Sequence, residues 1–299
     1  MIRMIIFSLC ISSAFAKDAP VFTYPKALEI ALETAKEAGN LLLEYWNRDV
    51  DLETQIKGSS PVTIGDLRSN ELICKKLLTA FPEFGLITEE KVSEEIEHGA
   101  LSRWREAEWT WVIDPLDGTR SFIAGKKEFG IHIGLMHFGV PVLGVNHYPV
   151  LKTTYFAMEG CGAYKQVKKK APERIFVEKS TNVVRPVISS RKSQFVHSFY
   201  SRLLKMPITQ KMLRKDFKIV GSCGLRLCLI AEGTRNIYAS SGESGRIWDF
   251  ASGSVILKEA GGFISDLEGN ALDFLSSDFK LKSGVLSCGP KDLFERSLK

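Results

Sequence analysis

The chain has 299 residues, of which 44% are apolar, 25% charged and 10% aromatic. This composition is typical of a globular protein and excludes a disordered, collagen-like or polytopic membrane chain. The 40 Lys and Arg residues exceed the 35 Asp and Glu residues by only 5, without a long basic run. This balance argues against a nucleic-acid polymer as partner and leaves small anionic substrates open.

Residues 1–16, MIRMIIFSLCISSAFA, have the three parts of a secretory signal peptide: a basic start, a short apolar run and an Ala-x-Ala ending. The run is too short to cross a bilayer, so no stable membrane span is expected. Cleavage after Ala16 would give an exported, periplasmic protein, whereas an uncleaved chain would be cytoplasmic or peripheral on the inner membrane. Cys10 lies in this segment, and the other 5 of the 6 cysteines show no zinc-site spacing, which indicates scattered buried thiols.

Two helices and then a series of strands are predicted for the first half. Apolar residues recur at helical spacing over 25–46 and again over 66–81, where Pro82 ends the pattern. Short apolar runs predict strands at 85–88, 109–113, 130–138, 142–148 and 153–158. The last three are expected to be antiparallel, because Gly and Pro turns separate them. A polar break at 165–170 predicts a boundary between an α+β subdomain, 24–167, and an α/β subdomain, 172–299.

Strands and helices alternate in the second half, which favours an α/β layer arrangement. Strands are predicted at 187–190, 217–220, 237–240 and 262–266. Helices are predicted at 193–204, 224–232 and 247–260.

The segment WTWVIDPLDGT, residues 109–119, is the most informative about chemistry. We expect a buried strand to end abruptly at Asp114, where Pro115 and Gly118 force a turn that carries Asp114 and Asp117. Two carboxylates in one tight turn repel each other unless a cation lies between them. Hard oxygen ligands of this kind suit Mg²⁺.

The same turn offers further polar groups. The Leu116 carbonyl is a possible additional ligand, and the N–H groups of Gly118 and Thr119 could hold a phosphate at the start of a short helix through Phe122. The alternative is that the two aspartates serve only as turn formers and a helix cap.

Three other acidic positions stand at the ends of predicted elements. Glu89 follows a strand, while Asp66 and Asp249 open helices. Each has a structural explanation, since Asp favours helix N-termini and Glu89 could be solvated. Their common placement is nevertheless that of site residues in α/β folds.

These acidic segments together resemble the inositol monophosphatase superfamily of Mg²⁺-dependent phosphomonoesterases. The resemblance covers about residues 24–299 and implies a layered α-β-α-β-α sandwich of the sugar-phosphatase type, within the α+β and α/β classes. The segments that carry it are Glu89-Glu90, DPLDGT at 114–119, WDFASG at 248–253, EAGG at 259–262 and PVTxxD at 61–66, with Lys57 upstream.

Within the superfamily the chain most resembles the 3′(2′),5′-bisphosphate nucleotidases of sulfate assimilation and sulfite synthesis. The supporting segments are DPLDGTRSFI at 114–123, SSRKS at 189–193 and GSCGLR at 221–226. The resemblance implies removal of the 3′-phosphate of adenosine 3′,5′-bisphosphate.

The resemblance also implies roles for individual residues. Asp66 and Thr119 would orient and deprotonate the attacking water. Roughly two or three Mg²⁺ ions would be held by Glu89, Asp114, the Leu116 carbonyl, Asp117 and Asp249.

A second phosphate on the substrate requires donors away from the metals. The first candidate is Arg226 with the loop at Gly221 and Ser222, because a Gly-rich turn that opens a helix binds anions. The second is Ser190 with Arg191, whose guanidinium suits bidentate phosphate contact.

Two other functions remain open at this point. One is an inositol or other small sugar-phosphate phosphatase on the same scaffold. The other is a catalytically silent ligand-binding homologue, against which the intact set of acidic residues argues.

Overall fold

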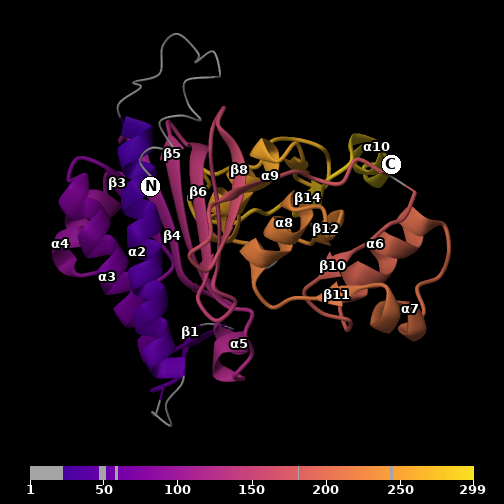
Figure 1. Ribbon diagram of the computed structural model, residues 1–299, viewed down its shortest axis with the longest axis horizontal. Helices are drawn as coiled ribbons and strands as arrows, with labels where there is room; N and C mark the ends of the chain where they lie inside the picture. The colour runs from indigo at the N-terminus through magenta and orange to yellow at the C-terminus, as the bar shows by residue number, and fades with distance from the viewer. Residues whose placement is uncertain (1–22, 47–51, 58–59, 181, 243–244) are drawn as a thin grey trace.

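A computed structural model describes residues 23–46, 52–57, 60–180, 182–242 and 245–299 (Figure 1). The predicted signal peptide, residues 1–16, lies outside these ranges. No helix within them is both long enough and apolar enough to cross a membrane.

A seven-stranded sheet in the order β3-β4-β5-β6-β7-β8-β9 forms the first half. Only the β3–β4 pair is parallel. The strands are β3 (Gly85–Thr88), β4 (Trp109–Asp117), β5 (Gly130–His137), β6 (Val140–Tyr148), β7 (Thr153–Met158), β8 (Gly162–Val167) and β9 (Glu173–Ile175). The last two strands were not predicted, because alternating polar side chains in β8 read as a break.

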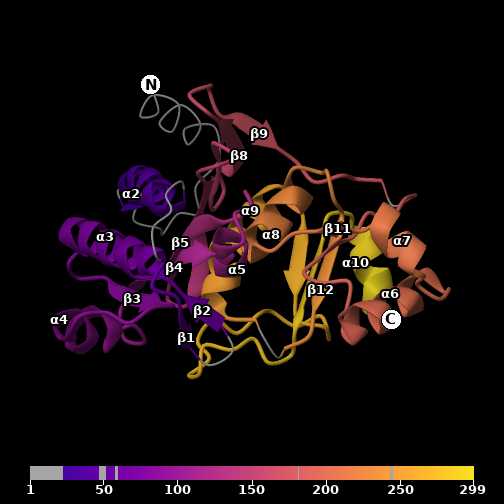
Figure 2. The same cartoon turned by 90° about the horizontal axis from the view of Figure 1, so that it is seen from below.

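Helices α2 (Thr23–Trp46) and α3 (Ile64–Ala80) cover one face of this sheet, as Figures 1 and 2 show. Both were predicted from their apolar spacing. The Thr63 side chain accepts a hydrogen bond from the Asp66 N–H and begins α3. Leu67, one of the apolar residues in the predicted helical pattern over 66–81, is nevertheless 38% exposed.

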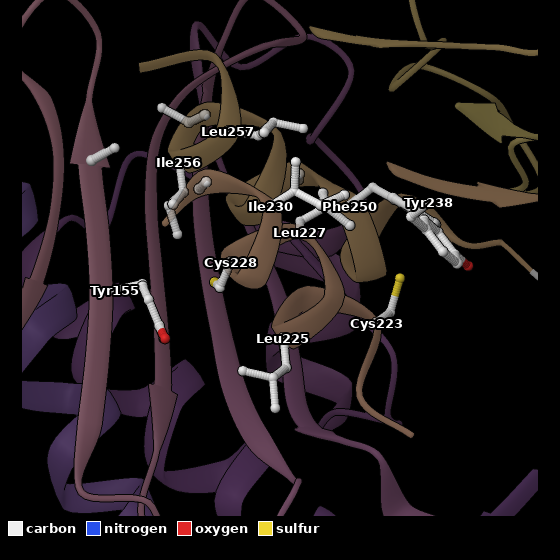
Figure 3. Packing of buried hydrophobic residues seen from close by; sticks show 14 of the residues in the cluster. Tyr155, Cys223, Leu225, Leu227, Cys228, Ile230, Tyr238, Phe250, Ile256 and Leu257 are labelled. Carbon is white, nitrogen blue, oxygen red and sulfur yellow. The ribbon is translucent and has the colours of Figure 1, made fainter. Parts of the chain in front are cut away.

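Helices α8 (Cys223–Ala231) and α9 (Ile247–Glu259) cover the opposite face. The hydrophobic core around these two helices includes Tyr155 of β7 on one side and Tyr238 of strand β12 (Ile237–Ser240) on the other (Figure 3). α9 approaches β6 so closely that a Cβ at Gly144 would lie 2.1 Å from the Ser252 carbonyl oxygen, so only glycine fits there.

A second group of strands and a third helix layer complete the molecule. β12 (Ile237–Ser240), β14 (Val285–Cys288) and β13 (Phe263–Ser265) are antiparallel, and β10 (Val187–Ile188) pairs with β11 (Lys218–Ile219) in parallel. α6 (Gln194–Leu204), α7 (Gln210–Lys215) and α10 (Lys291–Ser297) pack beyond them. Of these elements, α7, β14 and α10 were not predicted.

The layers therefore run helix, sheet, helix, sheet, helix, which confirms the predicted sandwich (Figure 1). The remaining elements are short: β1 (Gln55–Lys57), β2 (Ser60–Val62), α4 (Glu94–Ile96), the π-helical turn η1 (Glu97–Leu101) and α5 (Thr119–Ile123). The five described cysteines are free, and four are buried.

Candidate active site

Strand β4 continues through the segment where we expected it to stop. The prediction that the strand ends at Asp114 is wrong, because Asp117 still pairs with Gly130 after an irregularity in the ladder. Pro115, which has no N–H to donate, stands within that irregularity. Gly118 then adopts φ of +90° and leads the chain into α5.

A cavity of about 890 Å³ opens at this end of β4. Its lining joins the ends of β3 and β4, α5, the first turn of α9 and the segment from α7 to β11. The predicted site residues in the lining are Glu89, Asp114, Leu116, Asp117, Gly118, Thr119, Arg191 and Asp249.

Three of these carboxyl groups are crowded together: Asp114 is buried, and Glu89 and Asp249 are half-buried. Burial, and after it the negative charges of the neighbouring carboxylates, raise the pKa of Glu89 to about 8 and that of Asp249 to about 7. The same two causes raise the pKa of Asp114 well above its usual range. Buried carboxyls with mutually raised pKa values form a site in which a cation would relieve their repulsion.

Hydrogen bonds fix the backbone of Glu89 and the carboxyl groups of Asp114 and Asp249. The Glu89 N–H donates to the Ile113 carbonyl at 3.2 Å. The Asp114 side chain accepts the Leu116 N–H at 3.1 Å, and Asp249 accepts the Arg246 N–H at 2.8 Å at the start of α9.

Asp117 is held differently, by the N-terminus of α8. Its carboxylate accepts the Ser222 hydroxyl and the Cys223 and Gly224 N–H groups, the latter two at 3.0 Å each. His132 Nε2 lies 3.1 Å from Asp117 Oδ2. Burial would raise the pKa of Asp117, but His132 and these hydrogen bonds outweigh it, so this pKa is lowered.

His132 also joins the site, although its place in the predicted strand at 130–138 indicates only a core or rim position. It is fully buried, and its ring and the carboxyls of Asp114 and Asp117 offer ligand atoms within 4.8 Å of one another. A lone His in an apolar strand carries no sequence signal for this contact, which depends on the β4–β5 pairing.

Asp66 and Thr119 form a hydrogen-bonded pair beside the acidic cluster. The Thr119 hydroxyl lies 3.0 Å from Asp66 Oδ1 and 3.1 Å from the Leu116 carbonyl. The other Asp66 oxygen accepts the Thr63 N–H and hydroxyl. Burial raises the pKa of Asp66 to about 6 against the effect of these hydrogen bonds.

The other predicted substrate residues do not line the cavity. Ser222 is fully buried, and its hydroxyl donates to Asp117 and accepts the Leu225 N–H. The Arg226 guanidinium donates to the Val220 and Gly221 carbonyls and to the Tyr238 hydroxyl. Both positions suit support of the 221–226 loop more than contact with a substrate.

The SSRKS segment reaches the cavity through the expected Arg191, but through Ser189 in place of Ser190. Ser190 accepts the Lys192 N–H within its own turn, whereas Ser189 and Arg191 line the cavity. Further along the chain, α7 and β11 add Arg214, Lys215 and Lys218 to the lining. Sequence reasoning missed these three cations, because they belong to no motif and reach the cavity only through tertiary packing.

Comparison with known proteins gives consistent results. The model of the inositol monophosphatase family matches residues 24–297. The 3′(2′),5′-bisphosphate nucleotidase CysQ of Aggregatibacter actinomycetemcomitans is 33% identical over 249 residues, which are 83% of this chain and 87% of the relative.

Relatives with another name are nearly as similar. The Nus factor SuhB of Pasteurella multocida is 31% identical, over 81% of this chain and 85% of its own. The crystal structure of extragenic suppressor protein suhB from Bartonella henselae superposes with a TM-score of 0.72 at 25% identity, covering 92% of this chain and 98% of its own.

Proposed function

The chain belongs to the inositol monophosphatase family, and on that basis we propose that it is a Mg²⁺-dependent phosphomonoesterase that removes the 3′-phosphate of adenosine 3′,5′-bisphosphate. The observation that carries the proposal is the meeting of four acidic side chains of the predicted metal site around one cavity that Thr119, hydrogen-bonded to Asp66, also lines. Likeness to the CysQ nucleotidase supports the choice of substrate.

The donor set fits a hard divalent cation. Almost all of the atoms that could coordinate a metal here are oxygens, and the carboxyl groups among them repel one another. Such a set suits Mg²⁺. The residues that would hold it are Glu89, Asp114, Asp117, Asp249 and the Leu116 carbonyl. Mg²⁺ bound there would neutralise the phosphate charge and acidify a coordinated water.

The chain's own residues would orient and deprotonate the attacking water. Thr119 accepts the proton of that water while its own hydroxyl proton passes to Asp66, 3.0 Å away. With a pKa of about 6, Asp66 is mostly ionised at neutral pH and is still a useful base. The water oxygen then attacks phosphorus as the P–O ester bond breaks, the leaving oxygen takes a proton from solvent water to become the alcohol, and inorganic phosphate is released.

The cavity dimensions and charge support a substrate larger than a simple monophosphate ester. A volume of about 890 Å³ is near the upper end of ordinary ligand sites, which span about 300–1,000 Å³. Seven Lys and Arg residues line it beside five Asp and Glu residues, so basic side chains outnumber acidic ones. A nucleotide with two phosphates matches both properties.

The test is phosphate release by the purified chain with Mg²⁺, from adenosine 3′,5′-bisphosphate and from inositol 1-phosphate, compared by kcat/KM. We expect the nucleotide to be preferred and EDTA to abolish release. Preference for inositol 1-phosphate would overturn the substrate assignment. Absence of metal-dependent release from either ester would favour a silent ligand-binding homologue and overturn the enzymatic proposal.

A further inference from the structure

Apart from the carboxyl cluster, the cavity has a basic wall formed by α7 and β11. Arg214 and Lys215 stand in the last turn of α7, and Lys218 begins β11 three residues later. All three line the cavity that contains Asp114. In Figure 1, α7 and β11 lie toward the same lower end of the molecule as α5.

These cations are not neutralised by the protein. Within the part of the chain that the structure describes, none of the three side chains has a hydrogen bond or an ion pair. Arg214 and Lys215 are exposed and Lys218 is partly buried. The exposed Asp216 lies between them in the sequence but forms no ion pair with any of them in the described structure, so the segment keeps a net positive charge and favours binding of an anion.

The basic segment is also anchored in place. Arg191 Nε donates to the carbonyl of Leu213, the residue before Arg214, at 3.0 Å, and Leu213 is fully buried. The Arg191 carbonyl in turn lies 3.0 Å from a ring nitrogen of His197 on α6. These contacts hold the SSRKS loop and the end of α7 together as one wall of the cavity.

Arg226, the donor that the sequence favoured for a second phosphate, is already engaged. Its Nε and both terminal nitrogens donate to protein oxygens at 2.5–3.1 Å, and it is only 7% exposed. Among the described residues, the free cations of the cavity therefore include Arg214, Lys215 and Lys218 on α7 and β11, together with Lys126 and Arg235, but not Arg226 on α8.

We infer that Arg214, Lys215 and Lys218 form a second anion subsite, which binds the phosphate that is not hydrolysed. The inference rests on the proposed function, because the carboxyl cluster is taken to hold the phosphate that is cleaved. The subsite selects doubly phosphorylated substrates by binding and takes no part in the chemical step.

The test is a triple variant, Arg214→Ala, Lys215→Ala and Lys218→Ala. A matched control, Lys169→Ala, Lys170→Ala and Lys211→Ala, removes the same charge at positions outside the cavity lining. Both are assayed on adenosine 3′,5′-bisphosphate and on adenosine 3′-monophosphate, which lacks only the second phosphate. We expect kcat/KM for the bisphosphate to fall about 10- to 100-fold in the triple variant, through KM, with the monophosphate and the control unchanged. Equal loss on both substrates, or no loss on either, would overturn the subsite.

A binding experiment separates this inference from the proposed reaction. Adenosine 5′-monophosphate carries only the phosphate assigned to the subsite, and its Kd is measurable by calorimetry without turnover. We expect the Kd of adenosine 5′-monophosphate to rise about tenfold or more in the triple variant but not in the control. This result is expected whether or not the wild-type chain hydrolyses the bisphosphate. Equal affinity in all three proteins would overturn the subsite even if hydrolysis occurs.

Discussion

The two sides of the cavity are built by opposite means. The acidic side is buried or half-buried, and the carboxyls of Asp114, Asp117 and Asp249 each accept a backbone N–H. The basic side on α7 and β11 is solvent-facing, and its side chains have no protein partner among the described residues. Rigid, crowded carboxyls suit the chemical step, whereas free cations suit the choice of ligand. Variants on the two sides should therefore fail in different ways.

The largest effect is expected on the acidic side, at Asp114. Asp114→Asn keeps the side-chain shape but removes the charge that would bind the metal, so we expect kcat/KM to fall by about 10³-fold. The measurement is Mg²⁺-dependent phosphate release. Asp278→Asn, a surface change outside the cavity lining, is the matched control. Turnover near the wild-type rate in Asp114→Asn would show that the acidic side does not carry the reaction.

A somewhat smaller loss is expected at the Asp66–Thr119 pair. Thr119→Ala removes the hydroxyl that relays the proton, so kcat should fall about 10²-fold with little change in KM. Thr119→Ser retains the hydroxyl and should recover most of the rate. If Thr119→Ala changed KM alone, the residue would belong to the binding side of the comparison.

The pH profile of the wild-type enzyme tests the same pair. Asp66 must be ionised to accept a proton, and burial raises its pKa to about 6. We therefore expect kcat/KM to be steady above that value and to fall as the pH drops through it. An acid limb near the ordinary aspartate pKa, about 3.9, would contradict this role.

A more modest effect is expected from the support beneath the acidic side. Ser222→Ala removes the hydroxyl that donates to Asp117 and caps α8, so the Mg²⁺ concentration for half-maximal activity should rise about 10- to 100-fold. Ser193→Ala removes a comparable cap from α6 and should leave the metal requirement unchanged. An identical metal requirement in Ser222→Ala would mean that Asp117 is positioned without it.

The smallest effect is expected for the pH dependence of the Tm of the metal-free protein. Burial and mutual repulsion raise the pKa values of Glu89 and Asp249 above their unfolded values, to about 8 and about 7. Such groups contribute stability below the unfolded pKa and lose it as pH rises through the folded pKa. The metal-free Tm should therefore fall between pH 5 and pH 8, by about 2–4 °C for each kcal/mol lost.

Added Mg²⁺ should raise the Tm more at pH 8 than at pH 5, because it relieves the repulsion of ionised carboxyls. A metal-free Tm that rises over this range would contradict crowded carboxyls on the acidic side. The basic triple variant serves as control and should show the same trend as the wild-type chain.

The acidic side was largely open to prediction from sequence. Asp114 and Asp117 lie in one turn-forming segment, and their local chemistry alone predicts a cation site there. The course of the backbone there could not be predicted. Pro115 indicated the end of the strand, but the strand continues and Asp117 pairs with Gly130. Long-range pairing, which local propensity does not contain, decides that register.

The basic side was largely hidden from sequence. Arg226 lies at the start of a helix after a Gly-containing loop, which favours anion binding, but the fold turns it toward the Val220 and Gly221 carbonyls. Arg214 and Lys215 look like an ordinary solvated helix end. Only the packing of α7 against the loop at Arg191 brings them to the cavity.

The most direct test of the account is diffraction from crystals soaked in Mn²⁺, whose anomalous signal locates the ion in place of Mg²⁺. The account predicts strong peaks within coordination distance of the carboxylates of Glu89, Asp114 and Asp249. Absence of any peak there at saturating Mn²⁺, or peaks only at other positions, would contradict a metal-binding acidic side.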